Sequence, residues 1–371
     1  MMHKAAKGIY VHVPYCLSKC SYCDFLSFEK KHGMDEYVKT LIDEIGRCDL
    51  KDEISTVYIG GGTPTALPSR LLCKILDAVA AFDLTKDAEI TVEANPGTLT
   101  LEYLKEIKKH GANRLSFGLQ TTHPQLLKSI GRIHSMEDFE QNYHAARQAG
   151  FDNINIDLMF ALPNQTVAQW QQTLEKIVTL TPEHISAYSL TPAEGTPLYE
   201  DLENEKIVLP SDDIDRKMYH FARRFLASHG YGHYEISNFA KPGFESRHNI
   251  NCWRRVPYIG FGLGAHSFDD NSRWCNTGDI AEYLNGNQEK HELVQLSNEE
   301  ASAEAIILGL RLMDGIDAGI VTQDITALIQ EGLLIREVQQ GARLRLTEKG
   351  MDLANRVFGV FLEKRNTLRP D

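Results

Sequence analysis

The chain has 371 residues, 42% of them apolar and 24% charged, and a formal net charge of −12. This composition predicts a soluble globular protein with one large and one small domain. The acidic balance argues against nucleic-acid binding, which needs a basic surface, and no run approaches the roughly 20 apolar residues of a membrane span. Seven cysteines form no disulfide-type framework, and residues 1–7 lack the apolar core of a secretory signal. We therefore expect a reduced, cytoplasmic protein.

The first predicted strand leads directly into a cysteine-rich loop. Apolar β-branched residues alternate over residues 9–13, and Pro14 ends the strand. Cys16, Cys20 and Cys23 follow with the spacing C-x3-C-x2-C. Structural zinc usually takes four ligands in two separated pairs, and this chain has no second C-x2-C. Zinc and no metal remain alternatives, but three thiolates on one short loop favour a [4Fe–4S] cluster with one iron left open.

Five further strand–helix units are predicted up to residue 190. The strands are expected over residues 56–60, 89–94, 114–119, 154–160 and 185–190. The helices are expected over residues 34–48, 68–82, 101–110, 124–130, 136–149 and 167–180. Six strand–helix units in succession predict a parallel sheet wrapped by helices, and hence the α/β class with a partial (β/α)6 barrel.

Polar side chains and glycines recur where these strands end. Residues 60–63 follow the second strand, Glu93 and Gln120 lie at the ends of the next two, and Asp157 and Thr191 at the ends of the last two. Each alone would be an ordinary loop residue. Because ligand sites of β/α barrels gather at the carboxyl ends of the strands, together they predict one shared site.

The residue types suit one polar ligand. Consecutive glycines let the backbone approach a ligand closely. Glu93 and Asp157 can accept hydrogen bonds from an ammonium group or from hydroxyls, and Arg132 can hold a carboxylate with two parallel hydrogen bonds.

The pattern changes after the sixth strand. A helix is expected over residues 213–228, a strand and turn over 231–239, and one closely packed glycine-rich strand over 258–267. Residues 296–312 and 325–331 read as helical, followed by a small wing hairpin and a final helix over 349–362. We expect three parts: a core barrel over residues 1–235, a sheet extension over 236–294, and a small C-terminal helical, winged-helix-like module over 295–371.

The cysteine loop resembles a known signature. The spacing of Cys16, Cys20 and Cys23, flanked by Y-x-H-x-P-Y-C and C-D-F, resembles the radical S-adenosylmethionine (radical SAM) enzymes of the coproporphyrinogen oxidase-like branch. The resemblance implies that SAM binds the open iron of a [4Fe–4S] cluster and is cleaved to a 5′-deoxyadenosyl radical. The positions that it implies contact SAM are Tyr10, Tyr22, Gly62, Thr63, Glu93, Gln120, Arg132, Asp157 and Thr191.

Two functions compete within this branch. Residues 247–253, R-H-N-I-N-C-W, resemble the H-N-x-x-Y-W signature of HemW-type heme chaperones, with Cys252 in place of the tyrosine. Phe25 stands where the oxidases carry a fourth cysteine, and only 15 residues precede Cys16, fewer than in the oxidases. The resemblance therefore implies a heme chaperone without coproporphyrinogen oxidase activity. The alternative is an oxygen-independent coproporphyrinogen III oxidase, which decarboxylates two propionates.

A chaperone of this type would bind heme and pass it to acceptor proteins such as respiratory enzymes. Any contact with a membrane would come through those acceptors, and the sequence does not identify the electron donor. Histidine is the usual axial ligand of heme iron in binding proteins. His248 is our first candidate because Trp253 beside it could cover a porphyrin face, with Cys252 and His266 as alternatives.

Overall fold

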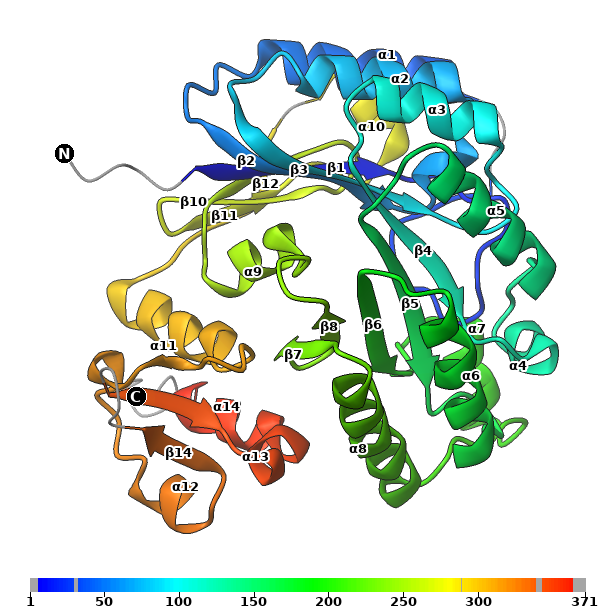
Figure 1. Ribbon diagram of the computed structural model, residues 1–371. Helices are drawn as coiled ribbons and strands as arrows, with labels where there is room; N and C mark the ends of the chain where they lie inside the picture. The colour runs from blue at the N-terminus through cyan, green and yellow to red at the C-terminus, as the bar shows by residue number, and fades with distance from the viewer. Residues whose placement is uncertain (1–5, 30–32, 288, 338–341, 363–371) are drawn as a thin grey trace.

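The computed structural model describes residues 6–29, 33–287, 289–337 and 342–362 (Figure 1). Its centre is a curved run of six parallel strands in the order β1-β2-β3-β4-β5-β6. The strands are β1 (Lys7–Val13), β2 (Ile54–Gly61), β3 (Leu84–Ala94), β4 (Arg114–Gln120), β5 (Ile154–Phe160) and β6 (His184–Ser189). The predicted α/β class and the partial parallel barrel are confirmed.

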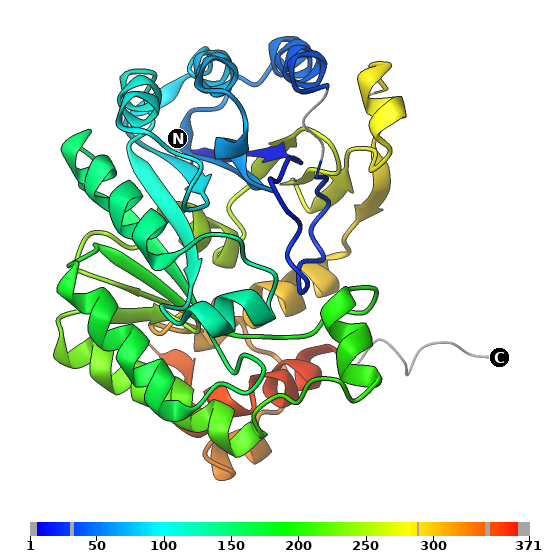
Figure 2. The same ribbon diagram turned by 90° about the vertical axis from the view of Figure 1, so that its right-hand side faces the viewer.

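Helices cover the convex face of this sheet, as the arc of helices in Figure 2 shows. They are α1 (Met34–Arg47), α2 (Ser69–Val79), α3 (Leu101–Lys109), α5 (Met136–Gln148), α6 (Val167–Thr179) and α8 (Asp212–Ser228). The short helix α4 (Pro124–Ser129) instead packs against Leu162 and Leu190, just beyond the ends of β5 and β6. Capping boxes at Ser135 and Thr166 fix where α5 and α6 begin, because each side chain accepts a hydrogen bond from a backbone N–H group of the first turn. The apolar faces of the helices pack on outward-facing strand residues such as Val57 and Ile59, which are fully buried.

Short strands extend the sheet at both edges. Beyond β1 come β9 (Tyr258–Phe261), β10 (His266–Asp269), β11 (Ser272–Cys275) and β12 (His291–Gln295). Beyond β6 come β8 (Asn238–Ala240) and β7 (Gly232–Glu235). The prediction of a single strand over residues 258–267 was wrong: β9 and β10 are two antiparallel strands joined by a turn. Gly262 and Gly264 make this turn with φ of 99° and 64°, a conformation that side chains with a Cβ rarely adopt.

The concave side of the sheet is closed by α9 (Arg247–Trp253), which packs against β2 (Figure 1). Ser246 caps this helix by accepting a hydrogen bond from the backbone N–H of Asn249 at 3.4 Å. The helix therefore occupies the amino-terminal end of the barrel interior, opposite the carboxyl ends of the strands. Neither α9 nor the helices α7 (Pro197–Glu203) and α10 (Ile280–Leu284) were predicted.

The C-terminal residues form a separate small module (Figure 1, lower left). It contains α11 (Asn298–Gly309), β13 (Ile316–Asp317), α12 (Thr326–Gln330), β14 (Leu334–Glu337), β15 (Arg343–Leu346), α13 (Glu348–Asp352) and α14 (Ala354–Leu362). The strands form their own antiparallel sheet over a second hydrophobic core. The expected final helix is broken at Leu353 into α13 and α14, and the expected hairpin lies at β14 and β15. No helix of the described residues is long and apolar enough to cross a membrane.

Candidate functional site

The cysteine loop is held across the carboxyl ends of the strands by backbone hydrogen bonds. The N–H of Cys16 donates to the carbonyl of Phe28 at 2.9 Å, and the N–H of Phe28 donates to the carbonyl of Pro14 at 2.7 Å. Ser21 bonds through its own N–H to Ile130 at 3.2 Å and through its carbonyl to the N–H of Leu198 at 2.9 Å. Figure 2 shows this deep-blue segment inside the arc of helices. Since these bonds use only main-chain atoms, the loop geometry does not depend on the cysteine side chains.

Two glycines allow neighbouring turns to approach this loop closely. A Cβ atom at Gly62 would lie 2.8 Å from the carbonyl oxygen of Tyr15. One at Gly131, whose φ is 76°, would lie 2.9 Å from the nitrogen of Ser21. Both distances are shorter than any side chain tolerates, so the glycines are required for the loop to lie against the strand ends.

The strand ends and the loop enclose one cavity of about 400 Å³. All the sequence-predicted site residues line it except Tyr10 and His248: Cys16, Cys20, Tyr22, Cys23, Gly62, Thr63, Glu93, Gln120, Arg132, Asp157 and Thr191. The three cysteines are free thiols and are partly exposed to this cavity. Residues from the loop and from five different strand ends are therefore brought together in space.

The guanidinium of Arg132 is partly buried and faces the cavity, and no carboxylate among the described residues is paired with it. One guanidinium nitrogen donates to Asn95 Oδ1 at 2.7 Å and another to the hydroxyl of Tyr22 at 3.0 Å. Its Nε atom is buried and has no hydrogen-bond partner among the residues that the structure describes. A partly buried charge of this kind is costly unless an opposite charge neutralises it. The arrangement fits a ligand carboxylate.

Two partly buried carboxylates face the same cavity. Glu93 accepts hydrogen bonds from the hydroxyl of Tyr58 at 2.7 Å and from the N–H of Gly61 at 3.2 Å. Asp157 accepts from Asn155 Nδ2 at 2.7 Å and from Ser116 Oγ at 3.2 Å. Burial raises the pKa of Glu93 to about 7, and the charge of Asp157 adds to this effect. Burial also raises the pKa of Asp157. A ligand that donates hydrogen bonds to Glu93 and Asp157 would stabilise the ionised form of both carboxylates.

The raised pKa of Glu93 predicts how the stability of the ligand-free protein depends on pH. The folded chain keeps this proton up to about pH 7, whereas the unfolded chain releases it near the ordinary value of 4.5. Stability should therefore fall as pH rises from 4.5 to 7 and level off above, by at most about 3 kcal/mol from this group. In the Glu93→Gln variant this part of the decline should disappear. Urea unfolding at pH 5 and pH 8 measures it, and an equal decline in parent and variant would contradict the assignment.

Gln120 reaches the cavity from a strained backbone. It is the last residue of β4, has a φ of 72°, and follows a register shift relative to β5. Such a conformation costs about 1–3 kcal/mol for a residue other than glycine and is concentrated at functional sites. The side chain is 2% exposed, and its Oε1 accepts a hydrogen bond from the hydroxyl of Tyr188 at 3.2 Å. This backbone conformation directs the amide into the cavity wall, where the bond from Tyr188 holds it.

Two residues that organise the site were not recognised in the sequence. Asn95 donates from Nδ2 to Thr63 Oγ1 at 2.7 Å while it accepts from Arg132, so it links two strand ends. His12 contacts the carbonyl of Leu26 through Nε2 at 2.8 Å and thereby anchors the cysteine loop. Asn95 could have been found from the sequence, because it comes directly after the third strand, where the other site residues also gather. His12 is the histidine of the Y-x-H-x-P-Y-C motif, but the motif did not show that its ring contacts the loop.

Tyr10 lies below the cavity, three residues before the end of β1. Its ring stacks on Tyr58 with centroids 6.5 Å apart, and its hydroxyl lies 3.0 Å from His12 Nδ1. It therefore contacts the wall of the site through Tyr58, which bonds to Glu93.

His248 lies deeper still, on α9 and outside the cavity lining. Its Nδ1 is 3.0 Å from Thr56 Oγ1, its ring stacks on Tyr58 at 5.1 Å, and its backbone N–H donates to Glu89 at 3.1 Å. Burial, with a contribution from the charge of Arg114, lowers the pKa of His248 to about 4, so the imidazole is neutral near pH 7. The histidine side chain is 7% exposed.

Comparisons with known proteins agree with this geometry. The Radical SAM superfamily matches residues 10–177. The heme chaperone HemW of Bacillus subtilis is 36% identical, over 96% of this chain and 99% of its own length. That of Escherichia coli is 38% identical over 70% of this chain and 69% of its own. In fold, the chain is similar to coproporphyrinogen III oxidase (HemN) from Escherichia coli, with a TM-score of 0.82, 23% identity, and coverage of 96% of this chain and 90% of that one. The resemblance noted in the sequence is thus confirmed, and the chain belongs to the HemW family of radical SAM proteins.

Proposed function

We propose that the protein is a heme chaperone that binds a [4Fe–4S] cluster, SAM and heme and delivers heme to acceptor proteins such as respiratory enzymes. The observation that carries this proposal is the identity to curated heme chaperones over nearly the whole chain, 36% in two bacterial relatives. The position of Phe25 supports it. This side chain, at the site of the fourth cysteine of the oxidases, is 64% exposed at the rim of the cavity.

The donor set of the loop fits a [4Fe–4S] cluster. Cys16, Cys20 and Cys23 supply three thiols to one cavity, and cluster iron is held by cysteine thiolates. Burial raises the pKa of Cys20, and the nearby charge of Arg132 opposes that effect and favours the thiolate. When bound, the cluster would supply one electron for the reductive cleavage of SAM.

The remaining groups of the cavity fit SAM. The unneutralised guanidinium of Arg132 would hold the carboxylate of the methionine part with two hydrogen bonds. Glu93 and Asp157 would accept hydrogen bonds from the ribose hydroxyls or the amine. Gly62 lets the backbone pass close to the ligand, and Thr63, Gln120, Tyr22 and Thr191 complete the wall.

For heme, we propose His248 as the axial ligand. Its neutral imidazole suits iron, and the contact of Nδ1 with Thr56 leaves Nε2 for coordination. Cys252 is a weaker candidate because burial raises the pKa of its thiol to about 11, which disfavours the thiolate. Since His248 is nearly enclosed, iron can reach it only if α9 moves away from β2.

The decisive experiment compares heme transfer with porphyrinogen oxidation in one preparation. The anaerobically reconstituted protein should bind heme and pass it to an apo heme protein. With coproporphyrinogen III, SAM and a reductant it should form no protoporphyrinogen. Formation of protoporphyrinogen at enzymic rates would show that the protein is an oxidase and not a chaperone. Failure of the parent to take up heme would also rule out the chaperone proposal.

The ligand assignment has its own test. His248→Ala should change the absorption spectrum of bound heme or weaken its binding, whereas the triple alanine variant of the loop cysteines should still bind heme. His144→Ala, which removes an exposed histidine on α5, is the matched control and should behave like the parent. Heme titration followed by absorbance measures all four proteins. A His248→Ala variant with parental affinity and spectrum would move the ligand elsewhere without affecting the chaperone proposal.

A further inference from the structure

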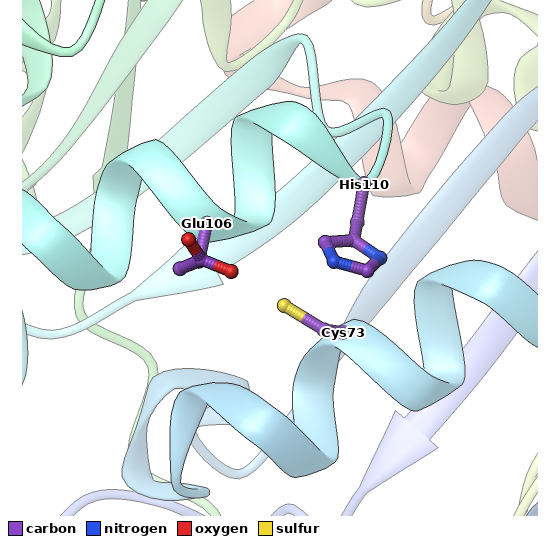
Figure 3. A group of neighbouring side chains, drawn as sticks. All are labelled: Cys73, Glu106 and His110. Atoms are coloured by element: carbon purple, nitrogen blue, oxygen red, sulfur yellow. The ribbon is translucent and has the colours of Figure 1, made fainter.

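A second cluster of metal-ligand side chains lies on the outer, helical layer, away from the cavity. Cys73 on α2 faces Glu106 and His110 of the neighbouring α3 segment (Figure 3). One ligand atom of each side chain, a sulfur, an oxygen and a nitrogen, lies within 4.8 Å of the other two. Cys73 is buried, His110 is partly exposed and Glu106 is exposed. None of them lines the cavity at the strand ends.

Metal-ligand side chains are spaced four residues apart on each of the two helices. Cys73 and Asp77 are four residues apart on α2, and Glu106 and His110 are four residues apart along α3 and its C-cap. Residues at this spacing lie one above the other on one helix face. Because α2 and α3 pack against each other, two such pairs face one another across a single interface.

Asp77 orients the histidine. Its Oδ1 lies 2.6 Å from His110 Nδ1, so this ring nitrogen donates to the carboxylate and Nε2 keeps its lone pair for a metal. Histidine ligands of metals are commonly held in this way by a carboxylate, which fixes the tautomer and raises ligand basicity. A simple surface pair of Asp77 and His110 would not explain why a thiol and a second carboxylate, those of Cys73 and Glu106, lie beside the same imidazole.

The chemistry of the three ligands selects the ion. Thiolate, imidazole and carboxylate together suit zinc, which binds sulfur, nitrogen and oxygen in tetrahedral sites, whereas magnesium and calcium take oxygen ligands. Burial raises the pKa of the Cys73 thiol to about 11, so zinc would have to displace its proton on binding. The resulting thiolate and one carboxylate would balance the charge of a divalent cation. A water molecule would complete the coordination.

We propose that Cys73, Glu106 and His110 bind one zinc ion, with Asp77 as the positioning residue. The site would join α2 to α3 on the outside of the barrel. These two helices follow β2 and β3, whose carboxyl ends carry Gly62 and Glu93. Zinc would therefore stiffen the outer support of two strand ends that form the cavity, without contacting the cavity itself.

The test uses the full chain with its loop cluster reconstituted, so that the three loop cysteines are occupied. After zinc is added and excess removed by gel filtration, elemental analysis should find one zinc per chain in the parent. Cys73→Ser and His110→Ala should lose it with unchanged cluster iron. Cys48→Ser and His144→Ala, which remove a thiol and an imidazole outside the group, should retain it. Asp77→Asn should weaken zinc binding by roughly 10–100-fold.

A second measurement distinguishes loss of a zinc ligand from misfolding of the variants. In the chain with Cys16, Cys20 and Cys23 all replaced by alanine, cobalt should produce thiolate-to-metal absorption that disappears when Cys73→Ser is added. Zinc should raise the melting temperature of this chain and leave that of its Cys73→Ser derivative unchanged. The proposal is overturned if the cluster-loaded parent retains no zinc, or if folded Cys73→Ser and His110→Ala variants retain as much as the parent.

Discussion

Cys20→Ala is expected to abolish the [4Fe–4S] cluster, with loss of the broad visible absorption and of stoichiometric iron and sulfide after reconstitution. Only three cysteines reach the cavity, so removal of one leaves two protein ligands for the cluster. The fold should survive, because the loop is held by main-chain bonds such as that from Ser21 to Ile130. Cys16→Ala and Cys23→Ala should give the same result.

The control for this experiment is Cys48→Ala, which removes a partly buried thiol at the C-cap of α1. It should retain parental iron and sulfide, and the circular dichroism of all four variants should match that of the parent. If protein purified without oxygen contains neither iron nor sulfide, but contains zinc that is lost in Cys20→Ala, the loop is a zinc site and the cluster proposal fails.

Arg132→Met is expected to weaken SAM binding by about 10–100-fold. A hydrogen bond to a charged partner contributes roughly 1.5–3 kcal/mol, and 1.4 kcal/mol corresponds to a factor of ten in affinity. The effect should be large because the guanidinium is partly buried and its hydrogen bonds go to the neutral partners Asn95 and Tyr22. Equilibrium dialysis of radiolabelled SAM against the cluster-loaded protein measures the change.

Two further variants separate charge from geometry. Arg132→Lys keeps the positive charge but loses the planar fork, and should bind SAM with intermediate affinity. Arg70→Met removes an exposed arginine that pairs with Asp35 on the outer surface, and should bind like the parent. Parental affinity in a folded Arg132→Met variant would place the carboxylate of SAM against a different group.

The sequence by itself determined the barrel and the composition of its cavity. Apolar periodicity is a local property, so the six strand–helix units could be located within a few residues from the chain alone. The carboxyl ends of parallel strands lie at one edge of a sheet. Knowing the strands was therefore enough to predict that Glu93, Gln120 and Asp157 would meet the cysteine loop, and they do.

Alternating glycines could not reveal the turn between β9 and β10. The pattern around Gly262 fits a strand equally well. Only the tertiary structure shows that the carbonyl of His12 lies 2.6 Å from where a Cβ would be, so that glycine is required at this turn. His12 was missed for a similar reason, since its partner Leu26 lies in a loop whose path is set by long-range contacts.

The tertiary structure alone decided which side chains are enclosed and which are neighbours across elements. A local motif cannot show whether His248 faces solvent, because its contacts with Thr56 and Tyr58 come from β2, nearly two hundred residues earlier. Likewise, nothing in the sequence joins Cys73 to His110. Their ligand atoms meet because two successive strand–helix units place α2 beside α3, and this packing is a property of the assembled sheet.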